Sequence, residues 1–309
     1  MTALPSLKQL HYLVALSAHL NFTRAAQSCF VTQSTLSAGL KELEDVLGAR
    51  LVERDRQTVL MTPLGLEVVS RARAILAATQ DLADFAAGAG ESMTGLIRLG
   101  VIPTIAPFLL PRAMQALRER YPKLKLALRE DLTANLLSRL EAGELDFVLI
   151  ALPYKTAQFL VETLFDDALW IVGLKNDPEL KAKQLHITSS ISDRLLLLEE
   201  GHCLRDHVLS ACGTSTSRSP GRVEATSLLT LVQMVESGFG VGLIPEMAIR
   251  SGLMESPNLI ARQIIKPAPR RTIALVARRS TPRHEDLKAL AELIRTVGST
   301  GTLPRRHPR

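Results

Sequence analysis

The sequence has few aromatic residues and few cysteines, and it contains no long apolar run. Aromatic residues make up 4% of its 309 residues, and only three residues are cysteines. Three cysteines are too few for a secreted, disulfide-stabilised fold, so any disulfide is expected to be transient and redox-sensing. No apolar run reaches the roughly 18–20 residues that a membrane span requires. The N-terminus also lacks the features of a signal peptide, and we therefore expect a cytoplasmic protein without a membrane partner.

Two common kinds of site are also missing from the sequence. No cluster of His, Cys and Asp has the spacing of a zinc site, so we expect no bound metal. No glycine-rich phosphate loop is present, and Gly238-Phe239-Gly240-Val241-Gly242 is better explained as a helix-to-strand turn. We therefore expect no cofactor, although the chain is long enough for two or more domains with real cores.

The charge is positive overall but unevenly distributed. The formal net charge of +6 suggests a polyanionic partner without locating it. Residues 1–65 hold six basic and five acidic residues, whereas residues 262–309 hold twelve basic and three acidic ones. Part of this C-terminal surplus lies in the last six residues, which are typical of a solvated tail. A nucleic-acid partner must therefore be argued from pattern rather than from charge.

The first sixty residues predict three helices and a small hairpin. The helices are expected at Leu7–Ala18, at Phe22 to about Ser28 with Asn21 as cap, and at Thr32 to Leu47, with Gly48 ending the third. Leu51–Val52 and Val59–Met61 then predict a hairpin, or wing, joined by a charged turn that contains Arg54. This order is that of a winged helix-turn-helix.

The third helix begins with small polar residues, which suit the part of a recognition helix that enters the major groove. Gln33 can pair with adenine, and hydroxyl groups next to it can contact bases or phosphates. The candidate DNA-binding residues are Thr32, Gln33, Ser34, Thr35, Ser37 and Arg54. An ordinary capped helix in a three-helix core has the same spacing, so the pattern alone leaves both interpretations open.

A long helix is expected from Thr62-Pro63 to about Ala87, with Thr62 as its cap. An apolar stripe on this helix suggests a face for a partner, and its members are Leu66, Val69, Ala72, Ile75, Leu76 and Leu82. Gly88-Ala89-Gly90 then predicts a hinge. Strands and helices alternate after it, which indicates α/β structure with a mainly parallel sheet.

One segment of the chain combines a thiol with residues that can activate it. It is Gly201-His202-Cys203-Leu204-Arg205-Asp206, and it is followed by Cys212. Positive charge near a thiol favours the nucleophilic thiolate, and a second thiol can resolve an oxidised first one as a disulfide. Two small buried residues would explain the same pair. The third cysteine, Cys29, is expected to serve packing.

The N-terminal motifs resemble the DNA-binding domain of LysR-type transcriptional regulators. They are Phe22-Thr23-Arg24-Ala25-Ala26, Gln33-Ser34-Thr35-Leu36-Ser37, Leu43-Glu44, Leu47-Gly48, Leu51-Val52-Glu53-Arg54 and Thr62-Pro63-Leu64-Gly65. Ser34 departs from the family, which often has proline there, but serine also suits a first helical turn. The resemblance implies a dimer paired through the long helix, followed by two α/β, periplasmic-binding-protein-like subdomains with an effector cleft.

The resemblance also implies domain boundaries. Residues 1–62 would form the winged helix-turn-helix, residues 63–90 the linker helix and hinge, and residues 91–309 the regulatory domain. Within the latter, subdomain I would take about 91–164 and 269–303, and subdomain II about 165–268. Crossovers between them are expected near Val161–Asp166 and Ile265–Arg270.

The cysteine segment resembles the peroxide-sensing members of the same family. The likeness also covers Ile102-Pro103-Thr104 with Leu109-Leu110-Pro111, and Lys266-Pro267 with Pro269-Arg270-Arg271-Thr272. It implies that Cys203 is the peroxidatic cysteine and Cys212 the resolving one. The residues implied around the peroxide are Thr104, Thr133, His202 and Arg271, while Asp206 could either hold Arg205 or move a proton.

The function expected from this resemblance is regulation of oxidative-stress genes by a reversible Cys203–Cys212 disulfide. The partners would be double-stranded promoter DNA, hydrogen peroxide, further copies of the chain as a dimer or tetramer, RNA polymerase, and glutaredoxin or thioredoxin as reductant. Two alternatives stay open: a LysR-type regulator that responds to a metabolite in the cleft, and an enzyme, a thiol peroxidase. The N-terminal DNA-reading pattern disfavours the enzyme.

Overall fold

The computed structural model describes residues 4–54, 59–87, 92–212, 224–265 and 268–299. The chain divides into two compact units, Met1–Gly90 with Ser138–Leu145, and Glu91–Leu137 with Asp146–Arg309. The predicted hinge Gly88-Ala89-Gly90 and the basic C-terminal tail lie outside the described residues. None of the described helices is both long enough and apolar enough to cross a membrane.

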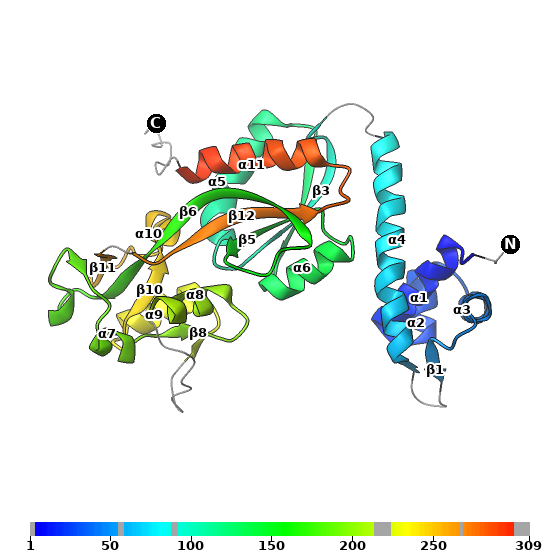
Figure 1. Ribbon diagram of the computed structural model, residues 1–309, viewed down its shortest axis with the longest axis horizontal. Coiled ribbons are helices and arrows are strands. Elements are labelled where there is room, and N and C mark those ends of the chain that lie inside the picture. Colours follow the sequence, from blue (N-terminus) through cyan, green and yellow to red (C-terminus); the bar gives the residue numbers. More distant parts are fainter. Residues whose placement is uncertain (1–3, 55–58, 88–91, 213–223, 266–267, 300–309) are drawn as a thin grey trace. The chain divides into compact units, whose positions relative to one another are not determined.

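The N-terminal unit is the predicted winged helix-turn-helix followed by one long helix (Figure 1). Its elements are α1 (Leu7–His19), α2 (Phe22–Ser28), α3 (Gln33–Leu47), β1 (Val52–Arg54), β2 (Val59–Met61) and α4 (Pro63–Ala87). The predicted caps are confirmed: Asn21 and Thr32 accept hydrogen bonds from the main-chain N–H groups of Arg24 and Thr35, and Gly48 has a left-handed φ of 64°. Such caps are local, which explains why the sequence predicts them.

The apolar stripe on α4 does not form one continuous face for a partner. Val69 and Ala72 are buried in the core of the helix-turn-helix, with Leu76 packed against it. Leu66, Ile75 and Leu82 are exposed. The prediction of a single partner-facing stripe was wrong in this respect, because α4 uses part of its apolar surface to complete its own domain.

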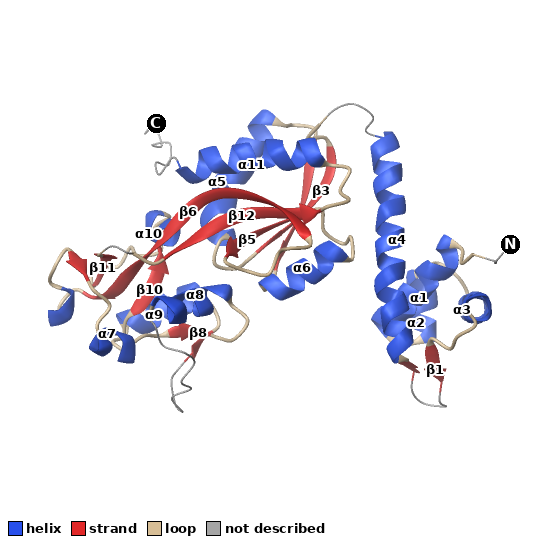
Figure 2. Cartoon of the chain, in the orientation of Figure 1, coloured by secondary structure: helices blue, strands red, loops and turns tan. Residues whose placement is uncertain are grey.

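The second unit contains the predicted α/β structure (Figure 2). Its first elements are β3 (Gly95–Val101), α5 (Ala106–Arg120), β4 (Leu124–Glu130), α6 (Thr133–Glu141), β5 (Phe147–Leu152) and β6 (Phe159–Leu174). The chain continues with a 3₁₀ turn (Pro178–Leu180), β7 (Gln184–Leu185), α7 (Ser189–Asp193), β8 (Leu197–Leu198), α8 (Cys203–Ala211), β9 (Glu224–Ala225) and α9 (Leu228–Glu236). It ends with β10 (Gly242–Pro245), α10 (Glu246–Arg250), β11 (Leu259–Ile264), β12 (Arg270–Arg278) and α11 (His284–Ser299).

The main sheet is mixed, and the prediction of a mainly parallel sheet was wrong. Its strand order is β4-β3-β5-β12-β6-β11-β7, with β10 also paired to β6. β3 pairs in parallel with β4 and β5, but β12 is antiparallel to both β5 and β6. One strand carries the chain out of the first subdomain and another brings it back, so the two run in opposite directions.

β6 is the longest of the described strands and belongs to both halves of the second unit. Phe159 to Ala168 pair with β12, whereas Leu169 to Leu174 pair with β10 and β11. The change of partners therefore falls just beyond the first predicted crossover. Part of the second predicted crossover, residues 266–267, lies outside the described residues.

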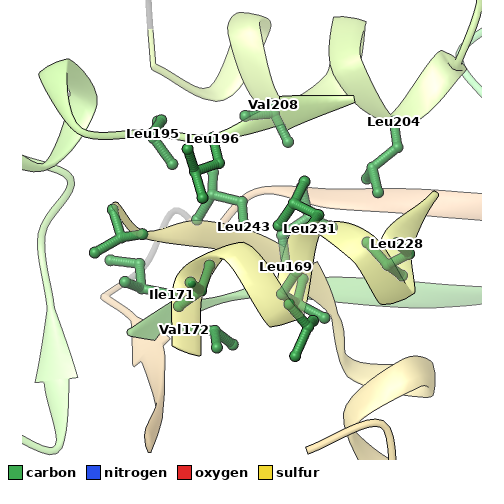
Figure 3. Close-up of a cluster of buried hydrophobic side chains, with 14 of the residues drawn as sticks. Leu169, Ile171, Val172, Leu195, Leu196, Leu204, Val208, Leu228, Leu231 and Leu243 are labelled. Atoms are coloured by element: carbon green, nitrogen blue, oxygen red, sulfur yellow. The ribbon is translucent and has the colours of Figure 1, made fainter. Parts of the chain in front are cut away.

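α8 packs one of its faces into the core of the second half. Figure 3 shows Leu204 and Val208 directed toward Leu228, Leu231 and Leu243. The two α8 side chains are only 2% and 4% exposed. Burying a side chain of this size stabilises a fold by about 1.5–3 kcal/mol, so this packing anchors the helix that starts at Cys203.

Candidate functional site

The candidate DNA-binding residues gather at the start of α3. Thr32, Gln33, Ser34 and Thr35 are exposed, and Ser37 is half-buried. The Thr32 hydroxyl lies 2.9 Å from that of Ser34 and 2.8 Å from that of Thr35. The Thr23 hydroxyl donates to Gln33 Oε1 at 3.2 Å, which connects α2 to the same surface. The side chain of Arg54 lies outside the described residues.

Arg271 is the centre of the second candidate site and is completely buried. Its Nη1 donates to Thr104 Oγ1 at 2.7 Å, and its Nη2 donates to the Thr104 carbonyl at 2.9 Å. Its Nε and Nη2 also donate to Asp167 Oδ2, at 3.1 and 3.0 Å. Asp167 is the cross-strand partner of Arg271 in the β6–β12 ladder. A buried charge is tolerated when it is paired and hydrogen-bonded in this way.

Cys203 is the first residue of α8 and is 5% exposed. Burial raises the pKa of its thiol, while the positive charge of Arg271 and the neighbouring Thr133 hydroxyl lower it. The start of a helix also favours a thiolate, because its free N–H groups carry partial positive charge. The site therefore combines a sulfur shielded from water with groups that stabilise its anion.

Thr133 comes to this sulfur from the start of α6, and it is buried. Its hydroxyl makes no full hydrogen bond with any residue that the structure describes. Gly201 brings the two loops together: it has a φ of 96°, and a Cβ there would lie 2.9 Å from the Leu132 side chain. The structure thus places Thr133 and Arg271 beside Cys203, with Thr104 hydrogen-bonded to Arg271. The roles that the resemblance implies for these residues stay predictions.

The other candidate residues lie at the edge of this group. The His202 ring is half-buried and is hydrogen-bonded by the main chain of Thr226; burial lowers the pKa of His202, while Glu199 raises it. Asp206 is exposed. Arg205 donates to Glu224 Oε1 at 2.6 Å, so Glu224, rather than Asp206, holds it.

Cys212 caps the end of α8, and its N–H donates to the carbonyls of Val208 and Leu209 at 3.2 Å. All three cysteines are free thiols. Nine residues of intact helix span about 13–14 Å, whereas a disulfide requires Cα atoms within about 7 Å. This conformation is therefore that of the reduced chain.

Sequence reasoning missed Asp167 and His207. Asp167 lies in the middle of a long strand and carries no local motif, so only the β6–β12 register shows that it neutralises Arg271. His207 follows Cys203 by four residues, a spacing that places both on one face of α8. That spacing was the available signal. Among the described residues, no cluster of three or more His, Cys, Asp or Glu side chains could hold a metal ion.

Comparison with known proteins identifies the family. The model of the bacterial regulatory helix-turn-helix protein, lysR family, matches residues 7–66, and that of the LysR substrate binding domain matches residues 90–299. The chain is 44% identical to HTH-type transcriptional regulator EstR of Acinetobacter baylyi over 97% of this chain and 99% of that protein. It is 38% identical to the DNA-binding transcriptional dual regulator OxyR of Escherichia coli over 94% and 95%.

A solved structure supports the same assignment along the whole chain. A full-length OxyR variant from Pseudomonas aeruginosa superposes with a TM-score of 0.77, at 35% identity and 95% coverage of both chains. Regulators of this family bind promoter DNA, form oligomers and are not enzymes. The chain therefore belongs to the family of LysR-type transcriptional regulators.

Proposed function

We propose that this regulator senses hydrogen peroxide through a reversible Cys203–Cys212 disulfide and controls oxidative-stress genes. The observation that carries the proposal is the position of Cys203, at the start of α8 and beside the buried Arg271, with Cys212 at the end of the same helix. Burial raises the pKa of the Cys203 thiol, while the Arg271 charge and the Thr133 hydroxyl stabilise the thiolate once it forms. The second thiol is separated from this sulfur by a whole helix.

The chemistry proceeds in two steps. The Cys203 thiolate attacks one peroxide oxygen, the O–O bond breaks, and the leaving hydroxide is protonated to water, which gives a sulfenic acid. The Cys212 thiol then loses its proton, its sulfur attacks the sulfenic sulfur to form the S–S bond, and the displaced hydroxyl group leaves with that proton as water. Thr104 and Thr133 orient the peroxide, because each hydroxyl both donates and accepts hydrogen bonds. His202 and Asp206 are proposed to assist from the edge of the site.

The structural output follows from the length of α8. The disulfide closes a loop of ten residues, which is worth roughly 2.5–3 kcal/mol of chain entropy. It cannot form while α8 is intact, so oxidation unwinds or displaces the helix. The change passes to a dimer or tetramer whose α3 helices read promoter DNA, and it alters contact with RNA polymerase. Glutaredoxin or thioredoxin in the cytoplasm reverses it by thiol–disulfide exchange.

In this proposal residues 1–62 bind DNA, residues 63–90 form the linker, and residues 91–309 form the regulatory domain. The residues proposed to contact DNA are Thr32, Gln33, Ser34, Thr35, Ser37 and Arg54. Within the regulatory domain, the subdomain boundaries fall near residues 164 and 268. The long strand β6 supports this division, since it pairs first with β12 and then with β10 and β11.

The test is a brief peroxide treatment of the reduced, full-length protein, followed by alkylation and mass spectrometry. We expect a Cys203–Cys212 disulfide that is absent from Cys203→Ser, and a changed DNA footprint only in the protein that forms it. Cys29→Ser is the matched control, because Cys29 packs in the DNA-binding unit. Absence of the disulfide, or a footprint that responds in Cys203→Ser, would refute the proposal.

A second candidate is a regulator that responds to another small molecule. The observation that favours it is a pocket near Asp167 lined also by Phe108, Phe165, Met247 and Arg250. The name of EstR, to which the chain is 44% identical, does not mention peroxide. If this candidate is right, a ligand that raises the melting temperature will change the footprint of Cys203→Ser as much as that of the unmodified protein.

A further inference from the structure

His207 is a buried titratable residue that the chemistry described so far does not use. It is 8% exposed and lies one helical turn after Cys203 on α8, between Leu204 and Val208 in the sequence, which the hydrophobic core buries. Its Nε2 lies 3.4 Å from the Pro153 carbonyl oxygen. Its Nδ1 is also buried but has no hydrogen-bond partner among the described residues.

A second buried polar atom close to Cys203, the Thr133 hydroxyl oxygen, also lacks a hydrogen-bond partner among the described residues. Only four buried side-chain polar atoms lack a partner in the part of the chain that the structure describes, and they include Thr133 Oγ1 and His207 Nδ1. The Thr133 hydroxyl neighbours the Cys203 sulfur, and the same Arg271 and Asp206 charges act on Cys203 and on His207. Leaving a buried polar atom unpaired costs about 1–3 kcal/mol, so a polar ligand that forms hydrogen bonds with these two atoms would remove that cost.

The partners of the ring fix its tautomer. The Pro153 carbonyl only accepts hydrogen bonds, so Nε2 carries the proton and Nδ1 presents a lone pair. Burial and the Arg271 charge lower the pKa of His207, whereas the hydrogen bond to Pro153 and the Asp206 charge raise it, and burial is the largest cause. Asp167 also pairs with Arg271, at 3.0 Å, and so offsets its positive charge. His207 is therefore a neutral base at physiological pH.

We propose that His207 Nδ1 is the base that takes the proton from the Cys203 thiol, through one bridging oxygen of peroxide or water. The inference rests on the proposed reaction of Cys203 with peroxide. The Cys203 S–H bond breaks and its proton reaches Nδ1, while the sulfur electron pair forms the new S–O bond. The O–O bond breaks, and the departing oxygen takes the proton from Nδ1 and leaves as water. Sulfur is oxidised by two electrons and peroxide is reduced by two.

The proposal explains how a thiol that burial keeps protonated can react at neutral pH. A base that takes a proton through one bridging oxygen meets the geometry that general base catalysis requires, and such catalysis contributes typically 10²–10⁴-fold. The spacing of four residues on α8 places His207 beside Cys203 on the helix surface. The neutral Cys203–His207 pair reacts at a constant rate between the pKa of His207 and that of Cys203. Without the base, only thiolate formed by solvent reacts, and its concentration rises tenfold per pH unit.

The test measures sulfenic acid formation at Cys203 by dimedone trapping, from pH 6.5 to 8, in full-length protein that carries Cys212→Ser. We expect a flat profile for this background and a rate that rises about tenfold per pH unit after His207→Gln, with a loss of about 100-fold at pH 7. Glutamine keeps a donor for the Pro153 carbonyl but cannot take the proton. His186→Gln, at an exposed histidine, is the control and should keep the flat profile.

Two outcomes would overturn the inference while leaving the proposed function intact: a flat profile after His207→Gln, or a tenfold rise per pH unit in the background protein itself. The second needs no histidine variant and so does not depend on the folding of His207→Gln. If no sulfenic acid forms at Cys203 at any pH, the proposed function fails first, and the inference fails with it.

Discussion

Unwinding of α8 has to pull Leu204 out of the hydrophobic core that it fills in the reduced chain (Figure 3). Replacing Leu204 with alanine should therefore weaken the reduced form more than the oxidised one. Truncation of a buried leucine costs about 2–5 kcal/mol, and the 2% exposure of Leu204 places it in that range. If the oxidised chain makes none of these contacts, the whole loss falls on the reduced form.

The loss of stability in the reduced form changes the redox potential of the Cys203–Cys212 pair. For a two-electron couple, 1.4 kcal/mol corresponds to 30 mV, so Leu204→Ala should make the Cys203–Cys212 potential more negative by about 40–110 mV. The sign is negative because a destabilised reduced form makes the disulfide harder to reduce. The potential is measured by equilibration in dithiothreitol or glutathione buffers, alkylation of free thiols and mass spectrometry.

Leu180→Ala provides the matched control. Leu180 is buried in the same core but belongs to the 3₁₀ turn Pro178–Leu180 rather than to α8. Its truncation should lower the melting temperature of both redox states alike and leave the potential unchanged. An unchanged potential in Leu204→Ala, together with the expected drop in melting temperature, would mean that the core keeps Leu204 after oxidation and that α8 does not leave it.

Three further predictions concern the ion pair, the ionisable groups and the DNA surface. Asp167→Asn leaves the buried Arg271 without its counter-charge, so we expect the free energy of unfolding to fall by about 3–5 kcal/mol. Because the unpaired Arg271 charge stabilises the thiolate more strongly, Cys203 should also be alkylated faster at pH 7; an unchanged alkylation rate would contradict this. His207 has a lowered pKa, so its contribution to stability is complete above about pH 6.5 and is lost as the pH falls through the folded value; urea unfolding between pH 7 and 5 should show a smaller decline in His207→Gln. Gln33→Ala should weaken operator binding in fluorescence anisotropy by about 1–3 kcal/mol at fixed salt, and equal affinity would exclude a base contact.

Local chemistry explains which parts of the fold could be predicted from the sequence. Asn21, Thr32 and Gly48 each act within a few residues of their own position, so the helix ends they predict agree with the structure. The cysteine site was predicted differently. The proximity of Thr104 and Arg271 came from a family resemblance, and no periodicity could have joined residues so far apart in the chain.

Long-range pairing explains what could not be predicted. Strand direction depends on which segments meet, so neither the mixed sheet nor the full length of β6 can be deduced from local apolar runs. In the sequence, Asp167 cannot be distinguished from the other residues of its strand. Only the register of β6 against β12 shows that it lies opposite Arg271. The division of the α4 stripe into buried and exposed residues could not be predicted for the same reason. Only packing against α1 distinguishes its core residues from its exposed ones.

The uninterrupted course of β6 limits how the regulatory unit can move. Because one strand is hydrogen-bonded first to β12 and then to β10 and β11, the two halves share a stiff sheet rather than a flexible linker. Rotation of one half against the other would have to twist or break that ladder. Under the proposed oxidation of Cys203, the short helix α8 would therefore rearrange more easily than the domain would open. β6 would then be the fixed frame against which that local rearrangement takes place.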